Sequence, residues 1–578
     1  MATTEPFTAS PQATHVARYP AQVEQENRTS QEVAGVGAAW RLELRFLLAL
    51  AVGLLVVSSI PFIWAYATSS PERPFMGLTH TTHDYSQYMA WARDSQTQVF
   101  VDNKLTPEPN DATFFNPVWW TVGRMQLVTG LSFAQVNQLL RLVAGLAFVL
   151  ILGAFAAVAV PAEQRRYALV LACVTSGLGW LLVVAKQALG ELVLPLLVHS
   201  FPGNTFFGMM VAPHMILSAS MVIGVFFLML EAYRKTCGRR AILAGLLGLV
   251  LGFAHPYNIV TVYSVLGVFS VVATLRDGFQ FRWFLKVVAF YLLSAPSVIY
   301  WMWVSAGSES WREVLAQYRN LGVFTPDPVQ LTILLGLTLI VAVATFRGLV
   351  PLRERSIERL FVDVWMVVNL FILYLPLNFQ FNLLSGIQVP LAIVAMRGIF
   401  ESVIPSLTRW LPTPAMSLAR LAPIVFILFV LPTNLYLVSW QVLDLSRRNY
   451  PEYLDRGDVA ALRWLDGTVN STDVILSSQA IGGWIPAQTG AHAFLAHGVN
   501  TLKYYEKRRL VDRFFAADGD DAARTETLKT YNVRYVFHGP AERAIGTFDL
   551  ASRPDLQPVF TSDRTTVYQV VPAVAGAR

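Results

Sequence analysis

Charged residues and cysteine are both scarce in this sequence. Only 14% of its 578 residues are Asp, Glu, Lys or Arg, whereas 54% are hydrophobic, and the mean hydropathy is +0.46. This composition excludes a single water-soluble core, so lipid must solvate much of the chain. The two cysteines, Cys173 in an apolar run and Cys237 in a basic loop, provide neither a disulfide framework nor a thiolate metal site.

Motifs for nucleotide and zinc binding are also missing. The sequence has no phosphate-binding loop, no glycine fingerprint for dinucleotides and no His-Glu-x-x-His helix in a suitable context. ATP-driven transport by this chain alone is therefore not expected. The net charge of +6 does not indicate a nucleic-acid partner, because the basic residues fall in short clusters between apolar runs.

Long apolar runs dominate the sequence instead. The first run, Phe46–Ala67, is long enough to span a bilayer as an uncleaved anchor, and no cleavable signal peptide precedes it. Residues 1–40 are polar and are predicted to be a disordered cytoplasmic tail. Further segments of spanning length lie at 137–160, 167–185, 208–230, 241–257, 258–275, 284–304, 329–346, 360–377, 387–404 and 421–441. The sequence thus predicts about eleven transmembrane helices, with a tight turn at His255–Asn258.

Basic residues of the short loops predict the orientation. With a cytoplasmic amino end, the outer short loops carry only Lys186, Arg312 and Arg319. The inner loops carry Arg165, Arg166, Arg234, Lys235, Arg239, Arg240, Arg276, Arg282, Lys286, Arg347, Arg353, Arg355, Arg359, Arg409 and Arg420. This excess predicts a multi-pass plasma-membrane protein whose N-terminus is cytoplasmic. An odd number of spans then places the long loop 68–136 and the carboxy-terminal region on the outer side.

The carboxy-terminal region has the composition of a soluble domain. The predicted organisation is a tail (1–40), a transmembrane domain with its large first outer loop (41–443) and an extracytoplasmic α/β domain (444–578). Its predicted helices are Val459–Leu465 and Leu502–Phe515, and its predicted strands are Val474–Ser477, Ala493–Ala496, Tyr535–His538 and Thr565–Val571.

The first outer loop contains two candidate amphipathic helices. The stretch His83–Ser95 places Tyr85, Tyr88, Met89 and Ala92 at helical spacing, and a second helix is predicted after Asn116-Pro117. Their aromatic residues suggest helices that lie in the membrane interface.

A dense polar cluster, His80 to Tyr88, follows closely after the first span. Asp84 could act as a general base for an acceptor hydroxyl, with His80 or His83 orienting it, or the three side chains could help to hold a divalent cation. Alternatively, Asp84 caps the interfacial helix by accepting hydrogen bonds from its first backbone amides. The two roles are compatible.

These features together resemble the GT-C superfamily of membrane glycosyltransferases. The stretch His83-Asp84-Tyr85-Ser86-Gln87-Tyr88-Met89 is similar to the loop motif of that superfamily, in which the aspartate is the base. Within it, the chain looks like the bacterial dolichyl- or polyprenyl-phosphate-mannose mannosyltransferase-like group. The resemblance implies a polytopic helical fold and a polyprenyl-phosphate sugar donor.

Several other polar residues are candidates for substrate binding. His214 and His255 lie near the outer ends of apolar runs, where ionisable groups often line a wet cavity. Gln380 belongs to an amide-rich outer loop. Candidates to bind the lipid phosphate are Arg93, Arg312, Arg319, Lys503, Lys507, Arg508 and Arg509. The predicted substrate-binding set is His83, Gln87, Tyr88, Arg93, His214, His255, Gln380 and Lys503.

The expected reaction is an inverting, hexosyltransferase-like transfer of a sugar at the outer membrane face. Asp84 would deprotonate a hydroxyl of a glycan, lipid or protein acceptor, which attacks the anomeric carbon of the lipid-linked sugar. No cofactor is required by this chemistry, although a divalent cation could stabilise the leaving group. The alternatives are a transporter or flippase for the same lipids and a non-catalytic assembly or sensor protein.

Overall fold

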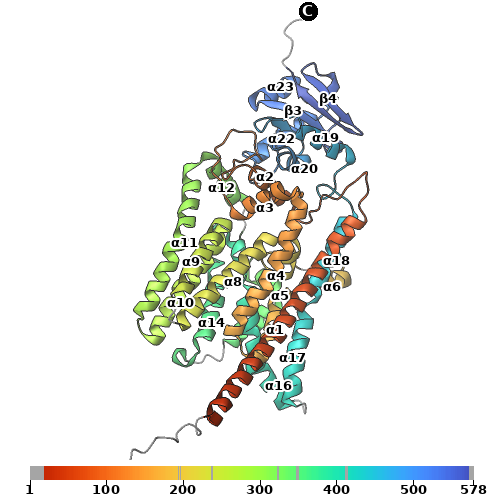
Figure 1. Ribbon diagram of the computed structural model, residues 1–578. Coiled ribbons are helices and arrows are strands. Elements are labelled where there is room, and N and C mark those ends of the chain that lie inside the picture. Colours follow the sequence, from red (N-terminus) through yellow and green to blue (C-terminus); the bar gives the residue numbers. More distant parts are fainter. Residues whose placement is uncertain are drawn as a thin grey trace, which may run out of the picture.

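The computed structural model describes residues 19–571, apart from 193, 195, 196, 236, 237, 322, 323, 347–350 and 411–413. A bundle of long helices carries a small α/β domain at one end (Figure 1). The bundle consists of α1 (Tyr19–Ala67), α4 (Phe133–Ala159), α5 (Ala162–Val174), α6 (Gly179–Leu189), α7 (Thr205–Val211), α8 (Pro213–Arg234), α9 (Arg239–Ala254), α10 (Pro256–Asp277), α11 (Phe281–Gly307), α13 (Pro328–Thr345), α14 (Ile357–Ile372), η2 (Gln380–Leu384), α15 (Gln388–Gly398), η3 (Ile399–Val403), α16 (Ile404–Trp410), α17 (Ala415–Val430) and α18 (Pro432–Ser446).

Many of these helices are long and apolar enough to cross a membrane. Eight helical stretches in the described part of the chain meet that test, and the bent pair α5 and α6 would make a ninth. Helices α9 and α14 have 16 residues each, so they fall short of the tested length. The chain is thus a multi-pass membrane protein, and the count of about eleven spans stays a prediction. The predicted turn at His255–Asn258 is confirmed, because α9 ends at Ala254 and Pro256 begins α10.

The amino-terminal tail differs from the prediction where the structure describes it. Helix α1 begins at Tyr19, so residues 19–40 of the predicted disordered tail continue the first span as a helix. Alanine, glutamine, glutamate and arginine, which recur in this stretch, favour helix, and extending an existing helix avoids the cost of nucleation. Residues 1–18 lie outside the described residues.

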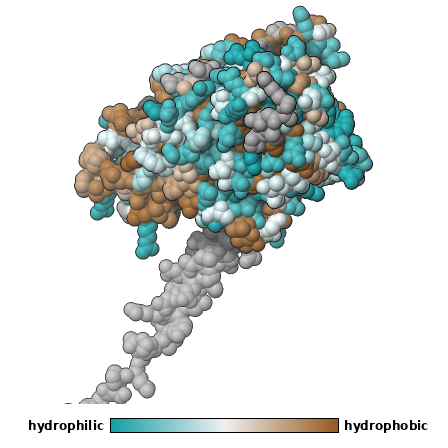
Figure 2. All heavy atoms as spheres, turned by 90° about the horizontal axis from the view of Figure 1, so that it is seen from above, coloured by the Kyte–Doolittle hydropathy of each residue, from teal (hydrophilic) through white to brown (hydrophobic). Residues whose placement is uncertain are grey.

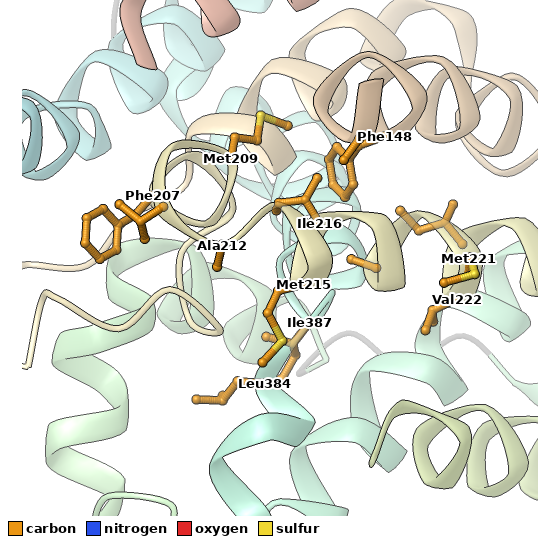
Figure 3. Close-up of a cluster of buried hydrophobic side chains, with 14 of the residues drawn as sticks. Phe148, Phe207, Met209, Ala212, Met215, Ile216, Met221, Val222, Leu384 and Ile387 are labelled. Atoms are coloured by element: carbon orange, nitrogen blue, oxygen red, sulfur yellow. The ribbon is translucent and has the colours of Figure 1, made fainter. Parts of the chain in front are cut away.

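The core of the bundle is packed by large apolar side chains. Figure 3 shows one such cluster, where Phe148, Phe207, Met215 and Ile216 gather against Leu384. All five are buried. Because these residues come from α4, α7, α8 and η2, the cluster joins the central helices to the short helix that follows α14.

The first outer loop contains the two predicted helices, α2 (Thr82–Asp94) and α3 (Pro117–Thr129). The prediction that they lie in the membrane interface is wrong for α2, whose aromatic side chains are interior. Tyr85 is 2% exposed and Trp91 is 7% exposed. Trp91 stacks on Phe114 with ring centroids 3.9 Å apart, and Tyr88 stacks on Trp119 at 4.3 Å. Aromatic periodicity alone could not distinguish a headgroup layer from a protein interior, since both favour these residues.

The carboxy-terminal domain is built on a five-stranded sheet of order β2-β1-β3-β5-β4. Strand β1 pairs in parallel with β2 and β3, whereas β5 pairs antiparallel with β3 and β4. The elements are α19 (Arg456–Asp466), β1 (Val474–Leu476), α20 (Gln479–Gly482), α21 (Trp484–Thr489), β2 (His492–Ala493), α22 (Tyr504–Phe515), α23 (Asp521–Thr530), β3 (Val533–His538), α24 (Pro540–Ile545), β4 (Leu556–Ser562) and β5 (Thr565–Val570). The predicted α/β class is confirmed, and β4, α20, α21, α23 and α24 had not been predicted.

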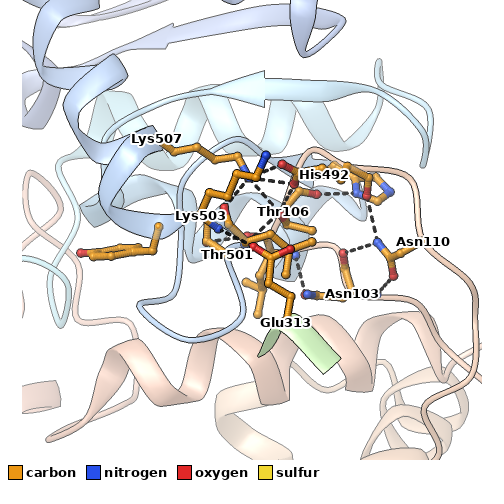
Figure 4. A network of polar contacts seen from close by, with 12 residues as sticks. Asn103, Thr106, Asn110, Glu313, His492, Thr501, Lys503 and Lys507 are labelled. Carbon is orange, nitrogen blue, oxygen red and sulfur yellow. Dashed lines mark hydrogen bonds and ion pairs between the residues drawn. The ribbon is translucent and has the colours of Figure 1, made fainter. Parts of the chain in front are cut away.

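The domain packs onto the first outer loop through a buried polar network. We call residues 102–110 the docking loop. Lys507 of α22 is fully buried and pairs with Glu108 of that loop at 2.5 Å, and its ammonium also donates to the Leu502 carbonyl at 2.5 Å. The His492 ring contacts the Thr106 carbonyl at 2.9 Å (Figure 4). The network fixes the domain over α2, because the contacts of Lys507 with Glu108 and of His492 with Thr106 join the domain to the loop that follows this helix.

The outer faces of the two parts differ in polarity. Seen from the domain side, hydrophilic residues cover most of the molecule, whereas hydrophobic residues gather at the left, where α9, α10 and α11 extend beyond the domain (Figure 2). This distribution agrees with a domain in water above helices in lipid.

Candidate functional site

Asp84 lies in the first turn of α2, directly beneath the carboxy-terminal domain. The two residues before that helix, His80 and Thr81, have positive φ angles of 56° and 31°. Such left-handed conformations cost roughly 1–3 kcal/mol each for non-glycine residues, so neighbouring contacts must hold them. One is the bond from the Thr82 hydroxyl to Glu452 Oε1 at 2.8 Å, which ties this turn to the chain just after α18.

The Asp84 carboxylate does not cap the helix. Helix α2 has no side-chain cap, and the backbone N–H of Asp84 itself donates to the Thr81 carbonyl at 2.8 Å. Asp84 Oδ1 instead lies 3.2 Å from His497 Nε2, and the side chain is 45% exposed. Among the described residues, Oδ2 accepts no hydrogen bond, so it is open to a substrate proton.

The contact at His497 has a defined donor and acceptor. The ring atom Nδ1 accepts hydrogen bonds from the backbone N–H groups of Val499 at 3.1 Å and Asn500 at 3.2 Å. An imidazole nitrogen that accepts carries no proton, so the neutral ring has its proton on Nε2. His497 therefore donates to Asp84.

A second layer of contacts fixes the segment 497–503, which we call the His497 loop. Thr501 Oγ1 accepts from the backbone N–H of His497 at 3.1 Å and donates to the Leu105 carbonyl at 2.6 Å. From the other side, Gln317 of α12 (Glu309–Leu321) donates to the Thr501 carbonyl at 3.0 Å. Thus the docking loop and α12 hold the His497 loop between them.

His80 and Tyr318 are two further titratable groups that interact with the Asp84 charge. Burial, followed by the nearby His199, lowers the pKa of His80 to about 4, so this ring is neutral at neutral pH. Burial also raises the pKa of Tyr318, which keeps its hydroxyl protonated and able to donate. Tyr318 accepts from Asn382 Nδ2 at 3.0 Å, and its own hydroxyl faces the Asp84 charge.

The predicted residues nearest to Asp84 occupy three different environments. His83 is exposed at the mouth of the site, whereas Tyr88 is packed against Trp119. Gln87 Oε1 accepts from Asn500 Nδ2 at 2.7 Å, so Gln87 supports the His497 loop. Of these three, His83 presents the most exposed polar group to a substrate.

His214 and His255 are brought together as predicted, but inside the protein. Their rings stack 5.5 Å apart, they are 5% and 7% exposed, and Tyr88 lies 4.8 Å from His214. The two rings thus belong to the protein interior against which α2 packs.

Three other predicted binding residues have structural partners. Arg93 forms an ion pair with Asp466 of α19, about 13 Å along the helix from Asp84. Both ends of the Gln380 amide are used, since Nε2 donates to the Leu375 carbonyl and Oε1 accepts from the Thr325 N–H. In this structure both side chains thus have protein partners, and their roles in substrate binding stay predictions. Lys503 is exposed, and its backbone N–H donates to Glu313 at 3.3 Å.

The remaining candidates to bind the lipid phosphate lie in different environments. The Lys507 ammonium forms a buried ion pair with Glu108, and the Arg508 side chain is hydrogen-bonded to Tyr504. Arg312 and Arg509 are exposed. The side chain of Arg319 lies outside the described residues.

The predicted cation site at His80, His83 and Asp84 does not form. In the described part of the chain, no group of three His, Cys, Asp or Glu side chains is placed to hold a metal ion. The His80 ring is turned toward Phe207, with centroids 4.9 Å apart, while Asp84 faces His497. These residues do not fit a cation.

His497 and Tyr318 were missed as neighbours of Asp84 by the sequence reasoning. His497 lies more than 400 positions after Asp84, in a loop without a recognisable motif. The one usable signal was topological, because the first outer loop and the carboxy-terminal region were predicted to lie on the same side of the membrane.

No protein-family model matches this sequence, and no curated protein matches it. Similarity appears in solved structures. The oligosaccharyltransferase of Archaeoglobus fulgidus in the apo form is 11% identical, with 85% of this chain and 69% of that chain covered and a TM-score of 0.53. The arabinofuranosyltransferase AftD from Mycobacteria is 13% identical, with 91% of this chain and 40% of that chain covered and a TM-score of 0.51. At these identities the similarity establishes the fold, and the GT-C fold that the sequence resembles is confirmed.

Proposed function

We propose that this protein is a membrane glycosyltransferase that moves a sugar from a polyprenyl-phosphate donor to an acceptor hydroxyl. The acceptor oxygen would attack the anomeric carbon as its proton passes to Asp84 Oδ2. The bond from that carbon to the phosphate oxygen breaks, and its electron pair leaves on the lipid phosphate, so the configuration inverts.

The observation that supports this proposal best is the Asp84 carboxylate itself. It is 45% exposed at the junction of bundle and domain, one oxygen is held by His497, and the other is open. A carboxylate that served only the fold would cap α2 or pair with a cation, and among the described residues it does neither.

The fold and the position of the site support the proposed donor class. The GT-C structures of similar fold are an oligosaccharyltransferase and an arabinofuranosyltransferase, both of which transfer sugars. Asp84 lies at the end of helices that would be solvated by lipid, where a polyprenyl-linked sugar presents its phosphate. His83, Lys503 and Arg312 are exposed on the same side and are our candidates to stabilise the leaving phosphate.

We also propose on which side of the membrane Asp84 lies. The outer loop 68–136 and the domain share one end of the bundle, and the arginine-rich loops lie toward the other (Figure 1). The positive-inside rule then assigns Asp84 to the extracytoplasmic face. A sugar already activated on a lipid needs no ATP there.

The test uses purified full-length protein and a panel of labelled polyprenyl-phosphate sugars, with transfer to added glycan, lipid and peptide acceptors as the readout. Asp84→Asn should abolish transfer. Asp111→Asn is the matched control, because Asp111 is an exposed carboxylate of the same outer loop and has no ion pair among the described contacts. Stably folded Asp84→Asn protein that transfers sugar normally would favour a transporter or an assembly protein.

A further inference from the structure

We infer that His497 is a positioning residue, through which the carboxy-terminal domain sets the orientation of the Asp84 base. This inference deepens the proposed function and depends on it. The established geometry is a single histidine that reaches from the domain to the end of the membrane bundle at Asp84 Oδ1, 3.2 Å away.

The direction of this hydrogen bond excludes the reverse assignment, in which His497 is the base. Its Nδ1 already accepts from Val499 and Asn500 N–H groups, and Asn500 Nδ2 lies 3.3 Å from the same atom. Its Nε2 proton is directed to Asp84. Neither nitrogen can take a proton from an acceptor hydroxyl, so the histidine acts through the carboxylate.

The ring is held far more firmly than a surface histidine would be. Its side chain is only 8% exposed, and the backbone N–H of residue 497 is fixed by Thr501 Oγ1. Thr501 is itself bonded to Leu105 of the docking loop. The Asn103 side chain donates to the Asn500 carbonyl at 2.7 Å. Movement of the domain would therefore carry the Nε2 donor away from Asp84.

The consequence for chemistry is that the base is complete only when the domain is docked. With Oδ1 held by His497, the carboxylate plane is fixed and Oδ2 is turned to the site, which is the arrangement that general-base catalysis needs.

The experiment compares two histidines of the same domain. His497→Phe keeps a ring but removes the donor to Asp84. His538→Phe removes another buried histidine of the domain, whose ring packs on Phe515 and, among the described contacts, touches neither the docking loop nor Asp84. We expect His497→Phe to lower kcat by about 10- to 100-fold, with KM changed less than about twofold. His538→Phe should show neither change when compared at equal folded fraction.

Rescue by a conservative variant distinguishes positioning from simple loss of structure. His497→Gln, which restores an N–H donor of similar reach, should recover much of the kcat that His497→Phe loses. The other titratable groups that interact electrostatically with Asp84 are His80, His83, Tyr85, Tyr88 and Tyr318, and all are unchanged in these variants.

The outcomes separate the inference from the proposed function. If Asp84→Asn is inactive but His497→Phe keeps full kcat, the inference is wrong and the proposed function stands. If His497→Phe and His538→Phe lose activity equally and His497→Gln gives no recovery, the loss is only structural and the inference is again wrong. If Asp84→Asn stays active, the proposed function itself fails.

Discussion

Lys507 is the residue whose loss should most clearly release the domain from the outer loop. Its side chain is fully buried, and it donates to both carboxylate oxygens of Glu108 at 2.5 and 2.7 Å, to the Leu502 carbonyl and to Thr106 Oγ1 at 3.2 Å. Lys507→Met keeps most of the volume of the side chain and removes every one of these bonds.

The size of the effect follows from the exposure of the partner. Removing one member of a buried ion pair costs about 3–5 kcal/mol when the other charge stays buried. Glu108 is 30% exposed and can regain water, so we expect a cost just below this range, about 2–3 kcal/mol. That is roughly a 30- to 150-fold shift of the docking equilibrium, since 1.36 kcal/mol corresponds to a factor of ten.

Hydrogen–deuterium exchange measured by mass spectrometry is the direct assay. Peptides from the docking loop and the His497 loop should exchange faster in Lys507→Met, while those from α4 and α8 should not change, because the bundle does not depend on the pair. Lys529→Met is the control, since Lys529 is an exposed lysine of α23 in the same domain. Native exchange in both loops of Lys507→Met would refute the docking account.

Three further predictions concern stability, packing and topology. Burial lowers the pKa of His538 to about 4, below its unfolded value, so its contribution to stability is full at pH 7 and is lost as pH falls from about 6.5 toward 4. His538→Phe should reduce this loss of stability at acid pH, measured as the change of the thermal unfolding temperature with pH. An unchanged dependence on pH would contradict the assignment. A Cβ at Gly123 would lie 2.1 Å from the Ala92 carbonyl oxygen, so Gly123→Ala should lower the free energy of unfolding by about 1–3 kcal/mol by separating α3 from α2. The control is Gly53→Ala in α1, where a Cβ would have nothing within 4 Å, and it should be neutral or stabilising in the same thermal unfolding experiments. A reporter that works only outside the cytoplasm, fused after Arg578, should be active, and a cytoplasmic signal would reverse the proposed orientation.

Much of the fold could be predicted because its signals are local. Runs of apolar residues gave the helices, a proline gave the turn before α10, and Asn116-Pro117 gave the start of α3, where the Asn116 side chain accepts from the N–H groups of Val118 and Trp119. The domain was recognisable from a change in composition after the last apolar run. Strand β4 was not predicted because Pro558 interrupts it and only Leu556 of its residues is buried, so no strand pattern shows in its sequence.

The site could be predicted only as far as one loop. Asp84 was identified from its own neighbourhood, but its partner His497 and the nearby Tyr318 come from distant elements, whose meeting depends on how the domain docks. The ion pair of Arg93 with Asp466 and the bond from the Thr325 N–H to Gln380 were likewise not predicted, because these partners lie far from them in sequence. Charge and side-chain type indicate what a residue can bind, while packing decides which partner it finds.

The account depends most on Asp84 as the base of a sugar transfer. The measurement is the turnover of a labelled polyprenyl-phosphate sugar by purified Asp84→Asn protein beside Asp111→Asn and the unaltered chain. We predict that Asp84→Asn loses activity by about 10²- to 10⁴-fold, as expected when a general base is removed, while Asp111→Asn keeps the normal rate. A folded Asp84→Asn protein with an undiminished turnover would contradict the account.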